Sequence, residues 1–247
     1  MEIRSVSAAN GWQWIVDGFG LFRQSPVIWI TLFIVYLLIG MVLTVIPVVG
    51  PIVLNLLAPV FMAGFMLGCR AIENGEELEI NHLFAGFKQN TSQLITVGGL
   101  YLAGMIVIVG MVFVMAGGSA ALSAMSAGHM PGKEAAAAAV DSGLLLAALV
   151  GLAALVPLIM AYWFAPTLVV FHDVKAVEAM KLSFTACLRN IWPFTVYILI
   201  SMALLVIAAI PLGLGLLAMI PTMTASLYVS YKDIFNPPPI GGGEIAL

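Results

Sequence analysis

Few side chains in this sequence are of the types that act as nucleophiles or bases. Ser119 and His129 place a hydroxyl and an imidazole in one segment. Acyl transfer needs the base within hydrogen-bond reach of the hydroxyl and donors for the oxyanion, and no second signature supplies them. The other histidines, His82 and His172, are too scattered for a zinc site, which needs convergent ligands. We therefore expect no catalytic residue and no metal site.

Cysteines and clustered acids give no stronger chemical pattern. Cys69 and Cys187 are the two cysteines of the chain, and they form no CxxC motif. We expect them to be small apolar side chains and not a disulfide or a metal site. The acidic stretch Glu73–Glu79 is typical of a solvated turn around Asn74-Gly75, with a divalent-ion site as the alternative. Nothing in these groups implies a cofactor.

The composition points to a membrane. Of the 247 residues, 62% are hydrophobic and 9% are charged, whereas an ordinary soluble domain is roughly 45–50% apolar and about 25% charged. A net charge of −3 also disfavours nucleic-acid binding, which needs a basic surface. These values predict an integral membrane protein and exclude a soluble enzyme or a disordered chain.

Six apolar segments are long enough to cross a bilayer, which takes about 20 apolar residues in a helix. Proline or glycine separates the members of the first and third pairs. Phe171 is the alternative end of the fourth segment, which would then continue past Pro166. The predicted spans are Val27–Ile46, Ile52–Cys69, Leu94–Ala116, Leu144–Phe164, Phe194–Ile210 and Leu214–Tyr231.

The basic residues predict the orientation. With six spans, eight of the nine Lys and Arg residues fall on the side of the two ends of the chain, and Lys133 falls on the other. Because cytoplasmic loops are enriched in Lys and Arg, we expect both ends in the cytoplasm. The eight are Arg4, Arg23, Arg70, Lys88, Lys175, Lys181, Arg189 and Lys232.

The cores of the six spans hold no ionisable side chain. Such a group inside the bilayer is costly and usually marks an ion or proton path. Its absence disfavours an ion-coupled pump. A transporter or channel for a small or lipophilic molecule remains an alternative, and a polar cavity near Asn55 or Thr222 would favour it.

A short amphipathic segment precedes each pair of spans, and each ends in a basic residue followed by amides. Helices of this kind lie at the membrane surface, where tryptophans form a belt. We expect Trp12, Trp14, Trp29 and Trp192 in this belt. The predicted interface or partner-binding residues are Trp12, Phe19, Phe22, Arg23, Phe84, Phe87, Lys88, Phe184, Arg189 and Trp192.

The predicted fold is an all-α polytopic membrane protein with six transmembrane helices and three cytoplasmic-side amphipathic helices. The same plan recurs over residues 10–69, 79–171 and 174–231, which predicts a threefold internal repeat in a single domain over residues 1–235. Residues 236–247 are expected to form a flexible tail. Two small-xxx-small pairs, Gly64 with Gly68 and Ala147 with Gly151, are expected to pack helices together.

Residues 117–143 are rich in Ala, Ser and Gly. They predict either a helical hairpin that extends the third and fourth spans or a loop.

Three motifs carry a resemblance. Gly11-Trp12-Gln13-Trp14, Phe22-Arg23-Gln24-Ser25-Pro26 and Gly68-Cys69-Arg70-Ala71 ahead of Leu83–Phe87 resemble a group of uncharacterised bacterial inner-membrane proteins. More distantly, the plan resembles the membrane domain of some glycerophosphoryl diester phosphodiesterases and its stand-alone relatives. The resemblance implies a six-helix inner-membrane fold and no transferable activity, because the motifs are structural.

The leading functional hypothesis is a non-enzymatic inner-membrane protein that organises the membrane or partner proteins through its interfacial helices. The expected partners are membrane lipids, with another membrane protein or a second copy of the chain as further candidates, and no nucleic acid. Transport is the alternative hypothesis, and an intramembrane enzyme is the third.

Overall fold

The computed structural model describes residues 2–118 and 133–235, and within these ranges every regular element is a helix. This confirms the all-α prediction. The predicted tail and most of the predicted hairpin over residues 117–143 lie outside the described ranges, although α6 begins at Lys133. The elements are α1 Asn10–Gln24, α2 Pro26–Thr44, α3 Val49–Glu73, η1 Ile80–Phe87, α4 Thr91–Phe113, η2 Val114–Gly118, α6 Lys133–Trp163, α7 Ala165–His172, α8 Ala176–Arg189, α9 Ile191–Ala209 and α10 Leu216–Phe235.

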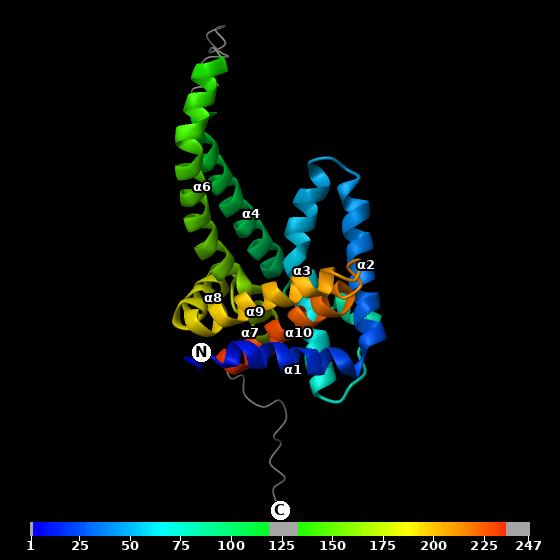
Figure 1. Cartoon of the computed structure of the whole chain (residues 1–247). Coiled ribbons are helices and arrows are strands. Elements are labelled where there is room, and N and C mark those ends of the chain that lie inside the picture. Colours follow the sequence, from blue (N-terminus) through cyan, green and yellow to red (C-terminus); the bar gives the residue numbers. More distant parts are fainter. Residues whose placement is uncertain (1, 119–132, 236–247) are drawn as a thin grey trace, which may run out of the picture.

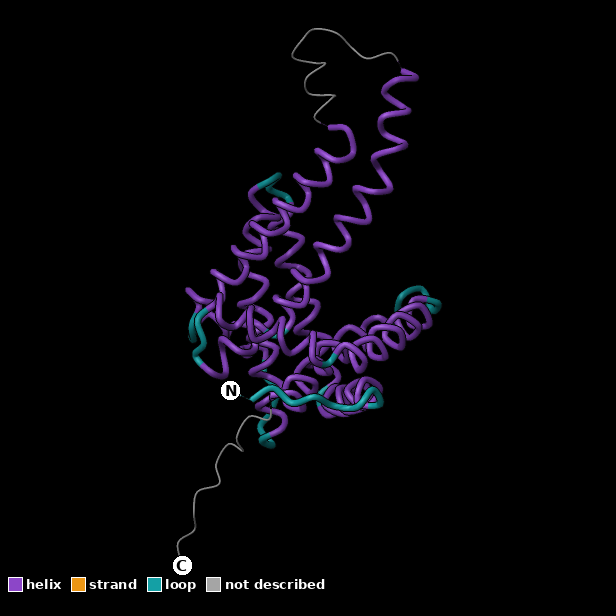
Figure 2. Tube along the Cα trace, turned by 90° about the vertical axis from the view of Figure 1, so that its left-hand side faces the viewer, coloured by secondary structure: helices purple, strands orange, loops and turns teal. Residues whose placement is uncertain are grey.

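Two helical hairpins rise from a layer of shorter helices and diverge (Figure 1). They are α2–α3 and α4–α6. The layer contains α1, η1, α7, α8 and the last turns of α10, and we call it the base layer. The third hairpin, α9–α10, projects sideways from it, as the view turned by 90° shows (Figure 2).

Five helical segments of the described chain are long and apolar enough to cross a membrane. They correspond to the first five predicted spans and begin or end a few residues from the predicted bounds. The segment predicted as the sixth span, α10, is not among them. It carries Pro221, several hydroxyl side chains, Lys232 and Asp233, and it packs along α1. The sixth span and the threefold repeat therefore stay predictions.

The buried core lies at the base ends of the hairpins. On α3 the buried side chains run from Pro59 to Ile72, whereas α2 buries only Trp29 and Leu32 among its side chains. In the apolar 18-residue stretch of α2, only 11% of the residues are buried inside the protein, and the same share is buried in the apolar stretch of α4 with η2. The remaining apolar surface is suited to lipid, because it has no protein to cover it in the described chain.

Small residues let α1 approach the third hairpin closely. A Cβ atom at Gly11 would lie 2.3 Å from the Pro193 carbonyl oxygen on α9, and one at Gly18 would lie 2.6 Å from the Ser226 amide nitrogen on α10. Either distance is a clash. These two positions therefore require glycine, as contacts between membrane helices often do.

The short helices η1 and α8 also turn small residues toward the protein. A Cβ atom at Gly86 of η1 would lie 2.1 Å from the Val60 carbonyl oxygen on α3. On α8, Ala176, Ala179, Ser183 and Ala186 are buried. On α8 the larger side chains Val177 and Leu188 are exposed, and on η1 the rings of Phe84 and Phe87 are exposed whereas Leu83 is buried.

Two tryptophans predicted in the surface belt lie inside the core instead. Trp14 is 1% exposed and Trp29 is 0% exposed. Trp29 stacks on Phe65 of α3, with ring centroids 6.2 Å apart. The prediction is wrong for these two because hydropathy and position do not reveal which side of a helix meets protein. Trp12 and Trp192 are exposed.

The predicted helix-packing residues lie at two contacts. A Cβ atom at Gly64 would lie 2.5 Å from the Leu83 carbonyl oxygen, and one at Gly68 would meet the Leu78 side chain, so this pair faces η1 and the loop before it. Ala147 is fully buried, and Gly151 faces Val112 at the end of α4.

A break between α6 and α7 is bridged by a hydroxyl of α8. The chain leaves helical geometry near Phe164, and Pro166 has no N–H to continue the ladder. Ser183 Oγ accepts a hydrogen bond from the Phe164 N–H at 2.9 Å and donates one to the Met160 carbonyl at 2.6 Å. Since Ser183 is fully buried, no water replaces these bonds.

Replacing this hydroxyl should therefore weaken the fold. We expect Ser183→Ala to lower the free energy of unfolding by about 1–3 kcal/mol, because both backbone groups lose their buried partner. The measurement is denaturant unfolding in detergent micelles. Ser92→Ala, at an exposed position in the first turn of α4, is the matched control and should have little effect. Equal stabilities of the two variants would contradict the bridging role.

Candidate functional site

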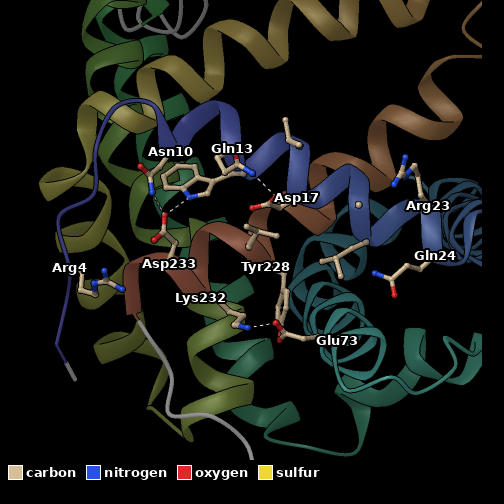
Figure 3. A pocket seen from close by; sticks show the side chains of 15 residues that line it. Arg4, Asn10, Gln13, Asp17, Arg23, Gln24, Glu73, Tyr228, Lys232 and Asp233 are labelled. Atoms are coloured by element: carbon tan, nitrogen blue, oxygen red, sulfur yellow. Dashed lines mark hydrogen bonds and ion pairs between the residues drawn. The ribbon is translucent and has the colours of Figure 1, made fainter.

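A polar cleft runs along α1 on the base layer (Figure 3). Its volume is about 910 Å³. The polar face of α1 forms one wall, the last turns of α10 form the other, and the end of α3 and the N-terminal segment close the rim. We call it the α1 cleft, and its polar lining comprises Arg4, Asn10, Gln13, Asp17, Arg23, Gln24, Glu73, Tyr228, Lys232 and Asp233.

Asp233 joins α10 to the start of α1. Its Oδ2 atom accepts hydrogen bonds from Trp14 Nε1 and Asn10 Nδ2, each at 2.8 Å. Both donors are uncharged, so the carboxylate keeps its negative charge within the cleft while its position is fixed. The indole N–H needs this partner, because Trp14 is buried.

Glu73 joins the end of α3 to α10 at the other side of the cleft. Its Oε2 atom accepts a hydrogen bond from the Tyr228 hydroxyl at 2.7 Å, and its Oε1 atom forms an ion pair with Lys232. The acidic turn predicted to be solvated therefore begins with a residue that takes part in a helix contact.

Arg4 and Arg23 lie toward opposite ends of the cleft (Figure 3). The Arg23 guanidinium lies 5.7 Å from the centroid of the Phe19 ring. Within residues 2–118 and 133–235, the ion pair between Lys232 and Glu73 is the one found, so neither arginine is neutralised by a carboxylate there. The cleft thus offers two cations at separate points, and between them it also holds the carboxylates of Asp17 and Asp233, which are hydrogen-bonded but not in ion pairs.

A buried amide places the segment that carries Arg4. Asn190 is fully buried between α8 and α9. Its Oδ1 atom accepts the Val6 N–H at 2.9 Å, and its Nδ2 atom donates to the carbonyls of Arg4 at 2.9 Å and Ala186 at 3.0 Å. This clamp holds residues 4–6 against the third hairpin.

Asn90 has a comparable role before α4. Its Nδ2 atom donates to the Val169 carbonyl at 3.2 Å and to Asp173 in the link between α7 and α8. The nearby Gln93 side chain accepts the Ala176 N–H at 2.9 Å. Two of the amides that follow the basic residues, Asn90 and Asn190, therefore join segments that are distant in the sequence, a role that spacing did not indicate.

The predicted interface residues do not form one site. Arg23 lines the α1 cleft beside Phe19, which is exposed, and Phe22, which is buried. The rings of Phe84 and Phe87 on η1 are exposed on one side and pack edge-on against Phe61 of α3. The others lie on separate parts of the base layer: Trp12 exposed on α1, Phe84, Phe87 and Lys88 at η1, Phe184 half-buried on α8, and Arg189 and Trp192 exposed near the junction of α8 and α9.

Groups with possible catalytic chemistry are apart in the described chain. Ser119 and His129 lie outside the described residues. His82 bonds to the neighbouring Glu79 backbone, and His172 contacts the Tyr231 hydroxyl at 2.6 Å. Across residues 2–118 and 133–235, no three His, Cys, Asp or Glu side chains are grouped to hold a metal ion.

Both cysteines are buried. Burial raises the pKa of the Cys187 thiol to about 12, so this thiol is protonated at neutral pH and is a poor nucleophile.

The polar side chains near which a cavity would favour transport bond locally. Asn55 Nδ2 donates to the Pro51 carbonyl at 2.9 Å, and Thr222 Oγ1 donates to the Ala218 carbonyl at 2.8 Å. Each bond stays within one helix. Transport remains an untested alternative.

The geometry of the α1 cleft can be tested at Trp14. We expect Trp14→Phe to lower the free energy of unfolding by about 1.5–3 kcal/mol, because the charged Asp233 loses a buried donor while the ring is largely conserved. Denaturant unfolding in micelles measures the change. Trp12→Phe, on the exposed side of the same helix, should be nearly neutral. Similar losses in both variants would show that aromatic area, and not the hydrogen bond, stabilises α1.

The chain was compared with known proteins. No family model matches it, and no solved structure matches it. It is 35% identical over 233 residues to a "probable inner membrane protein" of Burkholderia thailandensis, with 92% of this chain and 84% of that protein covered. None of these comparisons supports the distant resemblance to the phosphodiesterase membrane domain. The similarity over nearly the whole length, together with the five apolar helices, shows that the chain belongs to the family of this inner membrane protein.

Proposed function

We propose that this is a non-enzymatic protein of the bacterial inner membrane that organises partner proteins or the membrane through its base layer. The α1 cleft carries the proposal. It is a large open hollow beside helices suited to the bilayer, and its lining carries polar and charged side chains, among them Arg4 and Arg23, which have no carboxylate within ion-pair distance in the described residues.

The charges of the cleft favour a polar protein segment as its occupant. Arg4 and Arg23 are separated along the length of α1, so they suit two anionic groups spaced along an extended or helical segment. Between them, Gln13 and Gln24 offer amides that can donate and accept hydrogen bonds. A small phosphate-like ligand would reach one arginine and not both.

Exposed aromatic rings beside the cleft support a position at the membrane surface. Trp12 is 49% exposed and Phe19 is 45% exposed. Aromatic side chains of surface helices insert at the level of the lipid headgroups. In this arrangement α1 anchors the base layer on the cytoplasmic side, and six spans place both ends of the chain there.

The proposed topology is tested by reporter fusions at residue 2 and after residue 235. With six spans and a cytoplasmic base layer, we expect green fluorescent protein to fluoresce and alkaline phosphatase to be inactive at both positions. Fusions within residues 119–132 should show the reverse. Reporters on opposite sides at residues 2 and 235 would overturn both the six-span topology and the α1 cleft, because the Arg4 N–H donates to the Ile234 carbonyl.

Partner binding is tested by filling the cleft. Gly20 lines the cleft, and a Cβ atom there meets no atom within 4 Å, so Gly20→Trp blocks the hollow without disturbing the packing. Gly110 on α4 is equally unobstructed and lies outside the cleft. Gly110→Trp is therefore the matched control, since both changes favour the helix.

The readout is photo-crosslinking from position 13 in cells at native expression, followed by native mass spectrometry. We expect a discrete adduct that Gly20→Trp weakens about tenfold or more and Gly110→Trp preserves. The adduct mass identifies another membrane protein or a second copy of the chain. A bare monomer in the unblocked protein, or an equal adduct in Gly20→Trp, would overturn the proposal.

A further inference from the structure

A second hollow lies between α4, α6 and α8, away from the α1 cleft. Its volume is about 390 Å³, which falls in the range of about 300–1,000 Å³ typical of ligand pockets. The lining is apolar except for one residue: Leu100, Ala161, Val177, Met180 and Phe184 surround the hollow together with Lys181.

The walls of this hollow belong to helices that face lipid. Leu100 lies on α4 and Ala161 lies on α6. In the apolar 18-residue stretch of each of these two spans, only 11% of the residues are buried in the protein. Val177 of α8 is 52% exposed beside them. Since α8 lies in the base layer and the two spans rise from it (Figure 1), the hollow is suited to a hydrocarbon chain that runs up from the membrane surface.

Lys181 places a positive charge at the α8 side of the hollow. Its side chain is exposed, and it has no carboxylate within ion-pair distance in the part of the chain that the structure describes. Glu178 on the same helix is not paired with it. A single cation at the edge of an apolar hollow complements an amphiphile that has an anionic head.

We infer that this hollow binds one anionic phospholipid. The lipid phosphate contacts Lys181, and one acyl chain lies along Leu100 and Ala161 with Phe184 and Met180 beneath it. The inference concerns a lipid site separate from the α1 cleft, and it holds whether or not a protein binds there.

A neighbouring hollow provides an internal contrast. It lies between α6, α8 and α9 with a volume of about 310 Å³, and Trp163, Cys187 and Phe194 are among its lining residues. No charged side chain lines it. Lipid in this second hollow should therefore show no preference for the charge of the head, so a preference would come from Lys181.

The test is native mass spectrometry of the delipidated full chain in detergent. Phosphatidylglycerol and phosphatidylethanolamine with identical acyl chains are titrated separately. We expect the first phosphatidylglycerol to bind about fivefold more tightly, the factor that one lysine near a membrane surface supplies. Lys181→Glu should abolish the preference, and Lys175→Glu should keep it, since it changes the same charge outside the hollow.

A bulky variant separates the chain contact from the head contact. Ala161→Phe should weaken the first bound lipid of both types, because the ring occupies the acyl-chain position. The inference is overturned if the unmodified protein binds both lipids equally. It is also overturned if Lys181→Glu retains the preference, or if Lys175→Glu loses it to the same extent. Circular dichroism of each variant confirms that the helices are intact.

Discussion

The arrangement of the three hairpins depends on the base layer, because the apolar outer parts of the hairpins make few contacts with one another. Within a bilayer, lipid chains cover such surfaces as well as another apolar helix does, so burial alone does not draw them together. Contact is instead concentrated where small residues let backbones touch, at Gly11, Gly18 and Gly86. Hydrogen bonds that Asn190 donates and that Ser183 and Asp233 accept then fix the relative positions of the elements.

Sequence patterns predicted the spans well and the helix faces poorly. A long run of apolar residues is a strong local signal, so α2, α3, α4 and α9 were predicted within a few residues of their observed bounds, whereas α6 begins at Lys133, well before the predicted start at Leu144. In α10 the apolar residues alternate with buried hydroxyl side chains, so its hydropathy is lower than that of the other five segments and the sixth span stays a prediction. The face that meets protein on α1 holds glycines together with Trp14, whereas Trp12 faces outward. Periodicity identifies an apolar face but not whether lipid or protein covers it.

The candidate site was still harder to predict because its contacts join distant parts of the chain. Trp14 and Asp233 are 219 residues apart, and Glu73 and Tyr228 are 155 residues apart. Spacing along the sequence cannot bring such groups together without the fold. One signal was present: Lys232 and Asp233 interrupt the end of an apolar helix, where charges need partners. Arg23 was identified as an interface residue, but the cleft it lines was not.

The Asn190 clamp has a consequence for biosynthesis. It joins the first residues of the chain to a side chain made 184 residues later. At a synthesis rate of roughly 5–20 residues per second, that separation corresponds to roughly 10–40 s. During this interval the α2–α3 hairpin enters the bilayer while the segment around Val6 lacks its final partner. The last hairpin to leave the ribosome thus completes the structure begun by the first, and until then water is the partner of the Val6 N–H and the Arg4 carbonyl.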